Sequence, residues 1–179
     1  MKKSLSLFTA AFLAVCSLTA CGENKNAGGK EAVLQGSENY EEALKECFNA
    51  SFSTKGGKIF LSYMYPDIVI DKMKEDGSYD SFVINFNEQQ SKRPDLTDGV
   101  FEFEKIDEST PINEKQVDAV QDYYLSLCRD YFPEMKKEDF QINEGYEVSY
   151  SYTENGSNPQ SDAVLVINLG SEGWKVITG

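Results

Sequence analysis

The hydrophobic pattern of this 179-residue chain first changes from a helical to a strand period near Gly99. Between the N-terminal segment and that point, apolar residues recur at three- and four-residue intervals, which is the spacing of amphipathic helices. Downstream, Phe101 and Phe103 alternate with glutamates, which is the spacing of a half-buried strand. One more helical stripe follows before the alternation resumes. The pattern therefore predicts an α+β domain in which helices come first and a mainly antiparallel sheet follows.

Capping and breaking residues bound the predicted helices. Ser37 is a suitable N-cap for the first helix, Pro66 opens the third helical segment, and Pro133 stops the long helix in the second half. The helical segments are predicted over 38–52, 58–65 (helical or irregular), 66–76, 78–90 and 114–131. The core stripe of the long helix is predicted to be Val117, Val120, Tyr124, Leu127, Cys128 and Tyr131.

Three antiparallel strands are predicted after the long helix. In the first of them, alternation places tyrosines and one valine on a shared face, and the Asn155-Gly156 pair marks the turn that follows. The run 163–167 is apolar throughout, which is typical of a strand that is covered on both faces. A turn at 170–173 leads into a last strand at 174–177. The residues of the shared face are Tyr146, Val148, Tyr150 and Tyr152.

The N-terminal segment has the organisation of a secretory signal. Lys2 and Lys3 form a positive n-region, and the apolar run 5–18 is too short to span a bilayer. Leu18-Thr19-Ala20 then precedes Cys21, and this motif resembles the lipobox of bacterial lipoproteins. The resemblance implies cleavage before Cys21, a diacylglycerol on its thiol, and a lipid anchor in the cell membrane at its extracytoplasmic face. An ordinary secretory signal with an incidental cysteine is the alternative.

The chain is predicted to divide into a signal peptide at 1–20, the acylated cysteine and a flexible polar tether at 21–37, and one α+β domain at 38–179. The precursor carries 17 basic and 30 acidic side chains. Removal of the two lysines of the signal leaves 15 against 30, a net charge of −15. That balance argues against binding nucleic acid or anionic lipid through charge, and it favours cationic partners.

The sequence contains no histidine, which excludes Ser-His-Asp and Cys-His catalysis and removes the commonest transition-metal ligand. Asp76, Ser78 and Asp80 begin like a calcium loop, but the central glycine and the final glutamate of such a loop are missing. Neither a metal site nor a cofactor is predicted. Cys47 and Cys128 fall on apolar helix faces and are predicted to be two buried thiols, with a disulfide as the alternative.

The predicted order is helices, strand, long helix and three antiparallel strands, and the last strand begins with Gly173-Trp174-Lys175-Val176. This order resembles the cone-shaped superfamily named after nuclear transport factor 2. The resemblance implies a curved sheet wrapped on the long helix, and several lipid-anchored proteins of Gram-positive bacteria carry such a domain. A cystatin-like sheet packed on one helix is the alternative. Trp174 is predicted to anchor the last strand against the sheet or the long helix.

Tyrosines form the predicted ligand surface. Tyr146, Tyr150 and Tyr152 share a strand face, which is predicted to point toward Tyr124 on the long helix. Tyrosine combines an apolar ring with a polar tip, so this face would suit the pocket of a cone. A period-two aromatic face is more commonly the core face of a strand, and that interpretation stands beside the pocket.

The sequence predicts a membrane-anchored, non-catalytic lipoprotein that binds a small ligand or an envelope protein. One alternative is a small-pocket enzyme of the isomerase or dehydratase kind, and another is a structural module that dimerises. Ketosteroid isomerases of the cone superfamily combine a carboxylate base with tyrosine donors in a dry pocket. Here alternation sends Glu102, Glu104 and Glu147 outward, so no catalytic residue is assigned.

Overall fold

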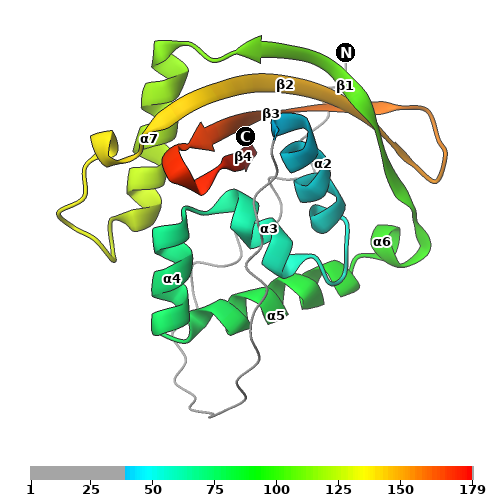
Figure 1. Cartoon of the computed structure of the whole chain (residues 1–179). Helices are drawn as coiled ribbons and strands as arrows, with labels where there is room; N and C mark the ends of the chain where they lie inside the picture. The colour runs from blue at the N-terminus through cyan, green and yellow to red at the C-terminus, as the bar shows by residue number, and fades with distance from the viewer. Residues whose placement is uncertain (1–38, 179) are drawn as a thin grey trace.

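The computed structural model describes residues 39–178 (Figure 1). Helices come first and a four-stranded antiparallel sheet follows, which confirms the predicted α+β class. The predicted signal peptide, Cys21 and the tether lie outside the described residues. The elements are α2 (Tyr40–Ser51), α3 (Gly57–Met64), α4 (Asp67–Glu75), α5 (Ser78–Ser91), α6 (Pro94–Asp98), β1 (Phe101–Pro111), α7 (Glu114–Cys128), η1 (Lys137–Asp139), β2 (Ile142–Glu154), β3 (Gln160–Leu169), η2 (Gly170–Glu172) and β4 (Trp174–Thr178).

An asparagine caps the first described helix. The side chain of Asn39 accepts a hydrogen bond from the backbone N–H of Glu42 at 2.8 Å, so α2 begins at Tyr40. The prediction of Ser37 as the N-cap was therefore wrong. Asparagine caps helices as well as serine does, and the later start lets the Tyr40 ring stack on that of Tyr146, with centroids 4.5 Å apart.

The long helix α7 ends earlier than predicted. Asn113 and Gln116 form a capping box that starts the helix where it was expected. At the other end, the N–H groups of Tyr131 and Phe132 both donate to the carbonyl oxygen of Cys128, and the chain leaves the helical path. The helix therefore stops at Cys128. Tyr131 lies at the surface, 41% exposed, and its prediction as a core residue was wrong.

The sheet has the order β1-β2-β3-β4, and every neighbouring pair is antiparallel. In Figure 1 its long strands arch over α2. The register of β1 with β2 shifts after Phe103 and again after Ile106, and each extra residue changes the phase of the alternation. Phe101, Phe103 and Ile106 therefore stay on one face despite unequal spacing. The predicted Asn155-Gly156 turn is confirmed, with φ angles of 54° and 63°.

Two hydrophobic clusters cover the two faces of β3. Val164 and Val166 belong to the first cluster, together with residues of α2, α3 and β2. Ile167 and Leu169 belong to the second cluster, together with residues of α4 and α7. The part of the apolar run from 164 to 167 is therefore covered on both faces, as predicted, whereas Ala163 is exposed.

The tyrosine face of β2 packs against α2. The ring of Phe48 lies 5.9 Å from that of Tyr150 and 5.5 Å from that of Tyr152. Tyr124 lies instead in the second cluster, with its ring 5.7 Å from that of Phe140. The prediction that the tyrosines of this strand face the helix of Tyr124 was wrong. The reason is that α7 belongs to the cluster on the other face of β3.

The two cysteines of the domain are free thiols in separate clusters. Cys47 belongs to the first cluster and Cys128 to the second, and both are buried. Burial raises the pKa of Cys47 to about 12, and burial together with the charge of Glu172 raises that of Cys128 to about 11. The prediction of two buried thiols is confirmed, and no disulfide joins them.

Candidate functional site: a groove beside a buried lysine

The tyrosines predicted to line a pocket are mostly core residues. The face that carries Tyr146, Tyr150 and Tyr152 packs against α2 in the first hydrophobic cluster. Tyr124 lies in the second hydrophobic cluster. The hydroxyls of Tyr124 and Tyr150 are buried without a hydrogen-bond partner among residues 39–178. Burial raises the pKa of both phenols, so they remain protonated. Tyr146 lies at the edge of this face, and its hydroxyl donates to the exposed carboxylate of Glu144.

An open groove of about 650 Å³ is lined by α2, α3, the first residue of α4 and the segment from η2 into β4. We call its buried lining residues the floor and its exposed lining residues on α2, α3 and their connection the rim. The floor is Ala50, Gly56, Tyr63, Trp174 and Lys175, and the rim is Glu46, Asn49, Lys55 and Ile59.

A glycine lets the chain turn tightly between α2 and α3. A Cβ atom on Gly56 would lie 1.9 Å from the carbonyl oxygen of Ala50, a distance that no side chain can occupy. The backbone N–H of Gly57 then donates to Oδ1 of Asn87 on α5 at 3.0 Å, which fixes the start of α3. These two contacts set α3 beside the end of α2, and the space they leave is the groove.

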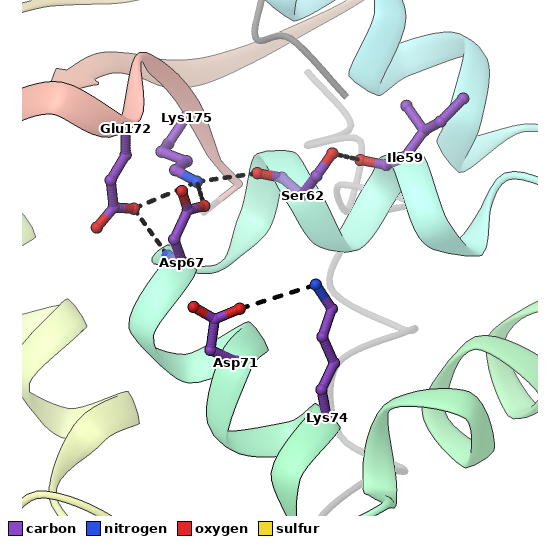
Figure 2. Close-up of polar contacts among 7 residues, drawn as sticks. All are labelled: Ile59, Ser62, Asp67, Asp71, Lys74, Glu172 and Lys175. Carbon is purple, nitrogen blue, oxygen red and sulfur yellow. Dashed lines mark hydrogen bonds and ion pairs between the residues drawn. The ribbon is translucent and has the colours of Figure 1, made fainter. Parts of the chain in front are cut away.

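Lys175 is held at the floor by three acceptors (Figure 2). Its Nζ lies 3.1 Å from the carbonyl oxygen of Ser62, 2.9 Å from Oδ1 of Asp67 and 3.3 Å from Oε2 of Glu172. Its side chain is only 3% exposed. The contacts with Ser62 and Asp67 are hydrogen bonds, and the contact with Glu172 is an ion pair. Lys175 therefore joins β4 to the end of α3 and the start of α4.

Glu172 makes a second contact beside its ion pair with Lys175. Its Oε2 accepts a hydrogen bond from the backbone N–H of Asp67 at 2.8 Å. That N–H belongs to the first turn of α4, where no helical carbonyl is available to accept it. Pro66, the N-cap residue, makes no side-chain hydrogen bond to this turn. The carboxylate from η2 therefore satisfies the start of α4 and, at the same time, pairs with Lys175.

The charged groups of the groove are unequal in number. Three carboxylates line it, those of Glu46, Asp67 and Glu172, against the two ammonium groups of Lys55 and Lys175, which leaves one negative charge in excess. The Glu46 carboxylate accepts a hydrogen bond from the hydroxyl of the buried Tyr63 at 2.5 Å. The groove thus combines aromatic residues in its floor with three carboxylates in its lining.

Trp174 is buried, as predicted, at 7% exposure. Its ring packs with those of Tyr40 on α2 and Tyr146 on β2, at centroid distances of 5.9 and 6.2 Å. It therefore anchors β4 against the sheet, one of the two predicted alternatives, and against α2, not against the long helix α7. The groove itself was not predicted. One signal was present, because alternation places Lys175 on the same face as the buried Ile177, and a buried ammonium requires acidic partners.

Comparison with models of protein families, with curated proteins and with solved structures found no match to this chain. Within residues 39–178, no helix is long and apolar enough to cross a membrane. The same residues contain no group of three or more His, Cys, Asp or Glu side chains arranged to hold a metal ion.

Proposed function

We propose that this protein is an extracytoplasmic lipoprotein whose domain binds a small ligand in the groove between α2, α3 and β4. The observation that supports this most directly is the groove itself. Its volume of about 650 Å³ falls within the roughly 300–1,000 Å³ of small-molecule sites. Trp174 and Tyr63 give it an aromatic floor, and Glu46 and Asn49 give it a polar rim. The polar groups of the rim would fix the orientation of a ligand that packs on the aromatic residues of the floor.

The anchor in this proposal is an acylated Cys21. The lipobox-like motif before it and the polar segment 22–37 after it support a domain tethered to lipid. The resemblance to the cone superfamily is part of the same proposal. It is supported by an antiparallel sheet that follows leading helices. The sheet arches over α2 (Figure 1), whereas the resemblance implied that it would wrap the long helix α7, which belongs to the second cluster.

An enzyme of the isomerase kind would need an ionisable group positioned beside the reacting atom. The buried polar residues within 39–178 are Ser51, Gln90, Ser151, Thr153 and Lys175. The ammonium of Lys175 already donates to Ser62 and Asp67 and forms an ion pair with Glu172. No arrangement in the described part of the chain favours catalysis over binding, and we therefore propose binding.

The groove is tested by ligand screening with a built-in reporter. Trp174 is the chain's single tryptophan and lies in the floor, so a bound ligand is expected to change its fluorescence. Compounds that bind should lose affinity for an Ile59→Arg variant, in which a long side chain replaces an exposed rim residue. Ile84→Arg is the matched control, because Ile84 is exposed on α5 and does not line the groove. Binding that survives Ile59→Arg unchanged, or a screen without any ligand, would contradict the proposal.

The anchor is tested by Cys21→Ser. The variant is expected to leave the membrane fraction and appear in the medium, or to accumulate as uncleaved precursor, because serine cannot carry the thioether-linked lipid. Cys16→Ser is the control, since Cys16 lies inside the predicted signal peptide and should have no effect on localisation. Fractionation and the mass of the mature protein give the result. A mature Cys21→Ser protein that stays membrane-bound would exclude this anchor.

A further inference from the structure

We infer that the ligand of the groove is a small organic cation that carries a primary ammonium group. The inference rests on the proposed binding function and adds the chemical class of the ligand. It follows from which charged groups of the groove already have partners within the protein. The numbers of carboxylates and ammonium groups differ by only one, so the sign of the preferred ligand depends on which of these groups can still form contacts.

The ammonium of Lys175 already makes two hydrogen bonds and one ion pair inside the protein. Its three contacts go to Ser62, Asp67 and Glu172, and its side chain is almost fully buried. An anionic ligand would have to displace one of these acceptors and leave it unpaired. Lys55, on the exposed rim, is then the remaining cation that an anion would meet.

The carboxylates keep free capacity. Asp67 and Glu172 contact Lys175 through one oxygen each, and their second oxygens have no hydrogen bond or ion pair within residues 39–178. Figure 2 shows one carboxylate oxygen of Glu172 directed away from Lys175. Glu46 likewise uses one oxygen, for Tyr63. Carboxylate oxygens accept several hydrogen bonds each, so these groups can also take ammonium protons from a ligand.

Two further features favour a cation. Trp174 and Tyr63 in the floor offer rings to which ammonium groups are attracted electrostatically. The chain as a whole carries a net charge of −13, which raises the local concentration of cations at its surface. A linear diamine of about four carbons fits within the groove's volume, and three carboxylates in the lining are available to its ammonium groups.

The test uses three four-carbon probes that differ only in their end groups: 1,4-diaminobutane, 1,4-butanediol and succinate. Binding is measured by calorimetry and by the fluorescence of Trp174. The diamine is expected to bind, and to bind more weakly as ionic strength rises. The diol and the dicarboxylate are expected to bind at least tenfold more weakly.

Two matched variants test whether a carboxylate of the groove contributes to diamine binding. Glu46→Gln removes a rim carboxylate and is expected to weaken diamine binding about two- to fivefold, the range for an exposed ion pair. Glu41→Gln makes the same change on the same helix outside the groove and should leave binding unaffected. Equal effects of the two variants would show that only the overall charge attracts the diamine, and would overturn the inference.

The two proposals fail differently. Preferred binding of the diol or of succinate, blocked by Ile59→Arg, would overturn the cation inference and leave the proposed binding function standing. If neither these probes nor any compound of the wider screen binds, both fail.

Discussion

Replacing Trp174 with alanine is expected to lower the free energy of unfolding by about 3–5 kcal/mol. The indole is 7% exposed and packs with the rings of Tyr40 and Tyr146. Truncation would remove that contact area and leave a cavity where β4 meets the start of α2. Because the substitution also enlarges the groove floor, ligand binding should weaken along with stability.

The measurement is urea unfolding followed by circular dichroism, since the variant has no tryptophan. Trp174→Phe is the control, because it keeps an aromatic ring in the same place and should cost less than the alanine variant. A loss below about 1 kcal/mol for the alanine variant would be typical of a surface site. It would show that the ring contributes little to the core.

Replacing Lys175 with methionine is expected to lower the free energy of unfolding by about 2–4 kcal/mol. Methionine keeps most of the stem's volume but removes the ammonium that joins β4 to α3 and α4. Breaking a buried ion pair by removing one partner typically costs about 3–5 kcal/mol. The expected loss is smaller here because Asp67, 61% exposed, regains water when the pair is broken. Glu172, more buried, is expected to contribute most of the loss.

Lys72→Met is the matched control for this prediction. Lys72 pairs with Glu75 at 3.1 Å on the surface of α4, and exposed pairs contribute up to about 1 kcal/mol. The double variant Lys175→Met/Glu172→Gln should recover part of the loss, because it also removes the carboxylate that the lysine neutralised. If Lys175→Met lowers the free energy of unfolding no more than Lys72→Met does, the contacts of Lys175 do not stabilise the packing of β4 on α3 and α4.

The sequence predicted the elements better than their partners. Hydrophobic periodicity places helices and strands because it depends on neighbours within a few residues. It indicated that 163–167 would be covered on both faces, but not which helix would cover which face. That choice depends on contacts between distant segments, and it is why the tyrosines of β2 meet Phe48 on α2 instead of Tyr124. The bulges of β1 were missed for a related reason, since an extra residue is specified by pairing with β2.

The groove could not be predicted from sequence patterns, because it too depends on contacts between distant segments. Its residues come from α2, α3, α4 and the segment from η2 into β4, and no short motif joins them. Three of the four tyrosines that the sequence singled out, Tyr124, Tyr150 and Tyr152, are buried, because a regular aromatic stripe is typical of a core face. Lys175 was the informative exception, a charged residue that shares a buried face of the last strand.

The position of β3 between the two hydrophobic clusters determines how this domain can unfold. Val164 and Val166 pack in the first cluster and Ile167 and Leu169 pack in the second, and these four lie within six consecutive residues. No cut through the chain separates the two clusters into fragments that each keep a complete interior. A protease nick at the Asn155-Gly156 hairpin would therefore yield pieces that stay associated or unfold together.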